Sequence, residues 1–112
     1  TNMQIIINSG THLPMNQDSI EQYQSEIAAS LKRFNDRITR IEVHLTDENS
    51  LAKGGADDIR CLMEARPASQ QPVSVEVRAA TVEQAIREGA STLKRRLTAM
   101  LEKSQTEQRR QR

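Results

Sequence analysis

Few side chains in this sequence could perform nucleophilic, acid–base or metal chemistry. The chain has one cysteine, Cys61, and two histidines, His12 and His44. None of them stands at a spacing that pairs a nucleophile with a base. Cys61 falls on the apolar side of an alternating segment, where a free cysteine usually acts as a small hydrophobic residue. The sequence therefore predicts a protein that is not an enzyme.

Two short motifs bear on metal and phosphate binding. Asp57 and Asp58 are adjacent carboxylates, but no EF-hand pattern or neighbouring histidine accompanies them. Lys53-Gly54-Gly55 has glycines as a phosphate-binding loop does, yet such a loop follows a strand, precedes a helix and places its lysine after the glycines. Here a strand follows, so the glycines are better explained by a flexible connection. We predict no metal and no cofactor.

Phosphate binding by basic side chains is the chemistry that the sequence favours. Residues 87–112 contain eight basic and three acidic residues, a net charge of +5, whereas residues 1–86 carry −4. The total of +1 hides this asymmetry, which is typical of a chain with an anionic partner. Blocks of charge on exposed helices are more often only solubilising, so the clustering rather than the count supports the prediction.

The basic residues of the last third of the chain lie on a predicted helix. At 100° per residue, Arg87 and Lys94 nearly superimpose and Arg95 stands about 80° from Arg87, while Arg96 borders the apolar stripe. A basic surface forms if the two helices lie side by side, because further basic residues stand near the end of the first helix and on the next strand: Lys32, Arg33, Arg37 and Arg40.

Periodicity predicts the elements that position these side chains. Continuous apolar residues over 3–7 predict a strand buried within a sheet, and alternation predicts strands over 40–46, 59–66 and 73–78. A helical stripe from Ile20 to Phe34 predicts a helix to about Asn35, capped by Asp18 or Ser19. Thr81 is predicted to cap a second helix, whose apolar stripe ends near Lys103.

The resulting order is β-α-β-β-β-α. A right-handed crossover makes the first two strands parallel, and the remaining strands form an antiparallel meander. Because each alternating strand has one apolar face, both helices should cover the same face. We predict an α+β, two-layer sandwich with a four-stranded mixed sheet over residues 1–103 and a flexible basic tail over 104–112.

The open face of that sheet is predicted to be charged and solvated, with arginines and glutamates on neighbouring strands. Aromatic residues make up only 2% of the chain, and both, Tyr23 and Phe34, belong to a helix stripe. Sheet modules that stack single-stranded bases need exposed aromatic residues. Any nucleic-acid contact should therefore recognise backbone and shape rather than sequence.

Features that the sequence lacks bear on the cellular location of the protein. With 112 residues it has the length of one domain, and a single cysteine allows no internal disulfide bond. No apolar run reaches the roughly 18 residues that span a bilayer, and no basic segment followed by an apolar one begins the chain. We expect a cytoplasmic protein with no membrane partner.

The ordered motifs resemble the ribosome-hibernation-promoting factors and ribosome-associated inhibitors. The similarity extends from Met3 to about Lys103 and includes Met-Gln-Ile-Ile-Ile-Asn at the start, Leu31-Lys32-Arg33-Phe34, and Ile38-Thr39-Arg40-Ile41-Glu42-Val43. The final helix adds Ala80-Thr81-Val82-Glu83-Gln84-Ala85-Ile86 and Leu93-Lys94-Arg95-Arg96-Leu97. The chain resembles a divergent short form, without the C-terminal dimerisation domain of longer members.

The resemblance implies a translation-inhibiting factor of stressed or stationary-phase cells. Family members bind the small ribosomal subunit near the decoding centre, where basic side chains of both helices contact rRNA phosphates; no DNA partner is expected. Arg33, Arg95 and Lys103 match basic family positions. Together with the helix geometry, this gives the predicted RNA-binding set: Arg33, Arg87, Lys94, Arg95, Arg96 and Lys103.

The chain also departs from the family pattern. Glu21, Ile27 and Ser30 stand where members commonly carry basic residues, and Glu83 replaces a usual tyrosine. The acidic first helix and the −4 body leave an alternative function open. In that alternative the chain is a protein-interaction module, dimerising or adaptor-like, which does not bind ribosomes.

Overall fold

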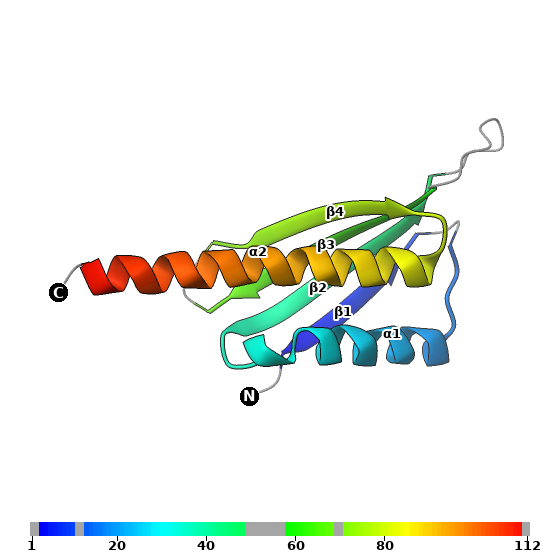
Figure 1. Cartoon of the computed structure of the whole chain (residues 1–112). Helices are drawn as coiled ribbons and strands as arrows, with labels where there is room; N and C mark the ends of the chain where they lie inside the picture. The colour runs from blue at the N-terminus through cyan, green and yellow to red at the C-terminus, as the bar shows by residue number, and fades with distance from the viewer. Residues whose placement is uncertain (1–2, 11–12, 49–57, 69–70, 111–112) are drawn as a thin grey trace.

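A four-stranded sheet covered on one face by two helices forms the molecule (Figure 1). The structure, a computed structural model, describes residues 3–10, 13–48, 58–68 and 71–110, the last seven as backbone only. The elements are β1 (Gln4–Ser9), α1 (Gln17–Ser30), the 3₁₀ turn η1 (Lys32–Phe34), β2 (Ile38–Asp47), β3 (Ile59–Pro67), β4 (Val73–Ala79) and α2 (Val82–Arg110). The predicted fold class and element order are confirmed.

The strands lie in the order β1-β2-β3-β4, with β1 parallel to β2 and the other neighbours antiparallel. The predicted crossover and meander are therefore confirmed. The prediction that the first strand is buried within the sheet is wrong, because β1 is an edge strand. The crossover through α1 places β1 on one side of β2, and the meander then leads away on the other side.

The apolar residues of β1 are divided between the two faces of the sheet edge. Ile5 and Ile7 pair in register with Ile41 and Val43, two buried residues of β2, so they face the core. Ile6 pairs with Glu42 on the opposite face and is half-buried. The edge is tied to α1 by the side chain of Gln24, whose Nε2 donates a hydrogen bond to the Ile5 carbonyl at 3.0 Å.

The core lies between the sheet and the helices. It contains the inward residues of all strands and the apolar stripes of both helices; its fully buried larger members are Ile27, Leu31, Phe34, Ile41, Val43, Leu45, Cys61, Met63, Ile86, Leu93 and Leu97. The predicted inward position of Cys61 is confirmed. Burial raises the pKa of its thiol to about 12, since a thiolate is poorly solvated among apolar side chains.

The first helix begins and ends earlier than predicted. Asn16, rather than Asp18 or Ser19, is the N-cap, and its side-chain oxygen accepts a hydrogen bond from the Ser19 amide at 2.8 Å. The helix ends at Ser30, and the chain tightens into η1, where the Phe34 amide bonds the Leu31 carbonyl at 3.0 Å. This tighter winding accompanies the burial of Phe34 in the core.

The second helix begins as predicted and ends later. The Thr81 hydroxyl accepts a hydrogen bond from the Gln84 amide at 3.1 Å, which confirms the cap. The helical backbone continues to Arg110, past the end of the apolar stripe at Lys103, because no glycine or proline interrupts it there. This last part projects beyond the sheet (Figure 1). The predicted tail at 104–112 thus begins in helical backbone, and its flexibility stays a prediction.

Candidate nucleic-acid interface

The two helices lie side by side and run in the same direction (Figure 1). Glu26, in the second half of α1, lies 4.0 Å from Arg87, near the start of α2. Beyond the end of α1, Arg33 and Arg37 line one groove together with Thr98 from the middle of α2. The helix arrangement that a shared basic surface requires is therefore present.

Charge is separated along this helical layer. Residues 17–26 of α1 and 82–88 of α2 carry the acidic side chains Asp18, Glu21, Glu26, Glu83 and Glu88. The segments that follow, η1 with the turn after it and residues 94–103 of α2, are mainly basic; besides the acidic Asp36 and Glu102, their exposed charged side chains are Lys32, Arg33, Arg37, Lys94, Arg95, Arg96 and Lys103. Asp18 and Glu83 lie in the first turns of α1 and α2, where they complement the positive end of each helix dipole. A polyanion therefore meets attraction at one end of the layer only.

The groove at the basic end joins η1 to α2. It is lined by Arg33, Phe34, Arg37, Thr98, Leu101 and Glu102. The guanidinium of Arg33 stands 5.1 Å from the centre of the Phe34 ring, a distance at which a cation is attracted by the ring face. Since the ring is fixed in the core, this contact orients Arg33 while leaving its donors exposed to solvent.

The basic residues of α2 point in three directions. Lys94 lies one helical turn before Thr98, which lines the groove, and therefore on the same side of the helix. Arg95 lies on the outer side and bonds Ser91 and Thr92 of its own helix, each at 3.3 Å. Seven residues nearly complete two turns, so Lys103 superimposes on Arg96 within about 20°, and both lie on the flank away from α1.

Arg87 differs from the other members of the predicted set because carboxylates surround it. Its Nη2 lies 2.8 Å from Glu83 Oε1, and its Nε lies 4.0 Å from Glu26 Oε1. The structure thus places Arg33 in the groove and Lys94 one helical turn before the groove residue Thr98, and it leaves Arg87 at the acidic end. Among the residues that the structure describes, Lys94, Arg96 and Lys103 have no carboxylate within ion-pair distance.

The open face of the sheet carries the ion pairs that its sequence pattern predicts, but most do not run straight across strands. In register, Arg40 stands opposite Arg66 and Glu42 opposite Glu64, so like charges face each other. The pairs instead run along each strand, with Arg40 Nε 3.5 Å from Glu42 and Arg66 Nη2 3.4 Å from Glu64. Arg40, expected beside the end of the first helix, therefore belongs to this face and not to the basic surface.

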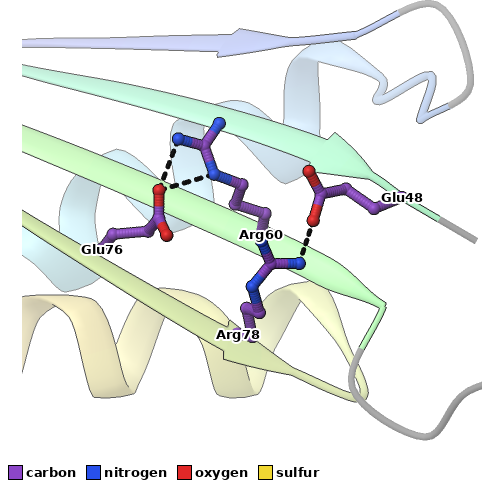
Figure 2. A network of polar contacts seen from close by, with 4 residues as sticks. All are labelled: Glu48, Arg60, Glu76 and Arg78. Atoms are coloured by element: carbon purple, nitrogen blue, oxygen red, sulfur yellow. Dashed lines mark hydrogen bonds and ion pairs between the residues drawn. The ribbon is translucent and has the colours of Figure 1, made fainter.

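Figure 2 shows the other end of this face. Arg60 of β3 bonds Glu76 of β4 diagonally, with Nε 2.6 Å from Oε2, and Arg78 pairs with Glu48. The hydrogen bond to Glu76 raises the pKa of Arg60 further above its usual value. Each of the four arginines on the open face thus has a glutamate partner, and the face offers little attraction to phosphate.

Two kinds of feature are absent from the described part of the chain. There, no group of three or more histidine, cysteine, aspartate or glutamate side chains could hold a metal ion. His12, the Lys53-Gly54-Gly55 motif and Asp57 lie outside the described residues. Over the same described ranges, no helix has the length and apolarity needed to cross a membrane.

Arg37 is the residue that the sequence-based set omits and the structure adds to the groove. It follows η1, where its amide bonds the Phe34 carbonyl at 2.9 Å. The basic run before β2 was visible in the sequence. The 3₁₀ turn that aims Arg37 at α2 rather than at the sheet was not, because the helical period predicted a continuous helix to Asn35.

Comparison with known proteins gives consistent matches. Residues 6–105 match the family described as Sigma 54 modulation protein / S30EA ribosomal protein. The fold is similar to the crystal structure of the Thermus thermophilus Protein Y N-terminal domain, with a TM-score of 0.65 and 21% identity over 89% of this chain and 99% of that one. A ribosomal subunit interface protein from Coxiella burnetii gives a TM-score of 0.64 and 11% identity over 88% and 97%. No curated protein sequence matches the chain.

Proposed function

The chain belongs to the Sigma 54 modulation protein / S30EA ribosomal protein family, and from this premise we propose that it binds small-subunit rRNA through the basic side chains of η1, of the turn after it and of residues 94–103 of α2. The family is one of ribosome-associated, non-catalytic modulation factors, in agreement with the resemblance to hibernation factors. The proposal goes further and assigns the rRNA near the decoding region as the partner, translation inhibition as the outcome and the cytoplasm as the location.

The separation of charge along the helical layer carries this proposal. Exposed basic side chains from two elements gather at one end, and the contacts that we propose come from Arg33, Arg37, Lys94, Arg95, Arg96 and Lys103. Phosphate contacts of this kind release counterions and make affinity depend steeply on salt. With no exposed aromatic side chain on the described sheet, recognition depends on the position of phosphates rather than on base identity.

Co-sedimentation with small ribosomal subunits tests the proposal. The test variant is Lys94→Gln/Arg95→Gln, and the matched control is Arg66→Gln/Arg78→Gln, which removes the same charge from the open face of the sheet. We expect the test variant to dissociate at lower salt, with the logarithmic salt slope reduced by roughly 0.7–0.9 for each lost phosphate contact. The control should sediment like the unaltered chain.

Two results would contradict the proposal. The unaltered chain could stay at the top of the gradient even at low salt, or the control could lose binding as much as the test variant. Light scattering on the same samples separates the alternative function. A dimer that does not bind ribosomal subunits would support the protein-interaction module, with a second copy of the chain as its partner.

A further inference from the structure

Arg87 sits between two carboxylates at the acidic end of the helical layer. Glu83 lies one turn before it on α2, and Glu26 reaches it from α1, at 2.8 Å and 4.0 Å respectively. One positive and two negative groups leave this cluster with a net charge of −1. A phosphate that approaches Arg87 therefore meets net repulsion, although an arginine is present.

The surroundings of Arg87 add to this repulsion. A hollow beside it is lined by Tyr23, Thr81, Val82, Glu83, Gln84 and Glu88, and Glu88 is a further exposed carboxylate. Figure 1 shows that α1 begins at the same end of the layer, and its acidic residues Asp18 and Glu21 lie in its first two turns. Among residues 17–26 of α1 and 82–88 of α2, none other than Arg87 is basic.

We propose that Glu26 and Glu83 are specificity determinants that close the part of the helical layer around Arg87 to RNA. The anionic partner would then contact only the groove end, which limits the register in which the chain can lie on a phosphate backbone. This inference rests on the proposed function and deepens it. Specific interfaces commonly contain built-in repulsive elements as well as attractive contacts.

The closure does not require strong ion pairs. The side chains of Arg87, Glu83 and Glu26 are 68%, 51% and 33% exposed, and pairs as exposed as these contribute little to folding stability. Their effect on RNA follows from net charge, which persists even when the individual contacts open. The two glutamates can therefore be replaced without an expected loss of the fold.

The test measures binding of poly(U) RNA and of small ribosomal subunits. The variant Glu26→Gln/Glu83→Gln frees Arg87, and the control Glu42→Gln/Glu64→Gln removes two carboxylates that pair with Arg40 and Arg66 on the open face. Both variants change the net charge equally. We expect the first to bind poly(U) about three- to tenfold more tightly, with a salt slope steeper by roughly 0.7, the value of one added contact. The control should change affinity less than twofold.

Arg87→Gln decides whether the gain comes from the freed arginine. In the unaltered chain this substitution should change RNA affinity less than twofold. In the Glu26→Gln/Glu83→Gln background it should reverse most of the gain. Circular dichroism melting curves confirm that each variant is folded.

The outcomes separate this inference from the proposed function. If Arg87→Gln weakens the unaltered chain as much as Lys94→Gln does, Arg87 is an ordinary phosphate contact and the inference is overturned while the function stands. If the unaltered chain binds neither probe at low salt, the proposed function is overturned. The inference then depends on whether the double glutamine variant gains binding, and no gain overturns it as well.

Discussion

Gly89 of α2 lies directly against Met63 of β3, so closely that a β-carbon at position 89 would stand 3.0 Å from Met63 Cε and 3.3 Å from its sulfur. The sulfur of Cys61 would lie 3.4 Å from the same carbon. Met63 and Cys61 are both fully buried. The missing side chain at position 89 thus allows α2 to pack closely over β3 at the centre of the core.

Replacement of Gly89 by valine should destabilise the protein by about 1–3 kcal/mol, the usual cost of overpacking a core. Gly89→Ala should be nearly neutral, because alanine gains up to ~1 kcal/mol of helix propensity while Met63 gives way. Ala99→Val, at an exposed position of the same helix, controls for the low helix propensity of valine. Urea unfolding gives the free energies, and equal losses at positions 89 and 99 would contradict the close packing.

Cys61 should make stability fall in alkaline solution. Its pKa is about 12 in the folded chain against 9.0 ordinarily, so above pH 9 the unfolded chain releases a thiol proton that the folded chain retains. Unfolding is then favoured as pH rises toward 12. The difference in free energy of unfolding between the unaltered chain and Cys61→Ala should therefore decrease by about 2 kcal/mol between pH 8 and 10.5. An advantage that is constant with pH would show that the thiol is not buried in solution.

Loss of the α2 cap should cost about 1 kcal/mol, because Thr81→Ala leaves the Gln84 amide without its side-chain acceptor. Thr81→Ser retains the hydroxyl and should restore most of the loss. Thermal unfolding of the three chains measures both effects. Equal melting temperatures for the alanine variant and the unaltered chain would argue against the cap in solution.

Deletion of residues 104–112 tests the proposed division between the domain and its tail. The deletion removes Arg109, Arg110 and Arg112 with only one acidic residue, Glu107. Because this part of α2 projects beyond the sheet, the melting temperature should change little, while RNA affinity and its salt slope should both fall. A large loss of stability would show that the segment belongs to the folded core.

Periodicity predicted most of the secondary structure because it reflects local physics. Strand residues alternate between faces, as those of β2 and β3 do, and the stripe of α2 follows the 3.6-residue turn. The prediction of a continuous helix through η1 failed for an equally physical reason. A 3₁₀ turn carries apolar residues at nearly helical spacing, so the sequence pattern alone does not distinguish it from continued α-helix.

The candidate site was only half predictable for a related reason. The sequence determined that the C-terminal third is basic, that Arg87 and Lys94 share one side of a helix, and that Cys61 faces inward. It did not determine what each side of that helix meets. Two residues on the same side of the helix, seven positions apart, therefore have different surroundings. Arg87 lies beside the carboxylate of Glu26, and Lys94 lies near the groove.

Only the tertiary structure decided these matters. The chain connections make β1 an edge strand and set α1 parallel to α2, which gathers acidic residues at one end of the layer and basic residues at the other. The local sequence determines which face of an element is apolar, because that face follows from the spacing of apolar residues along the element. Which neighbour covers each flank depends on contacts between distant segments, and no local pattern encodes them.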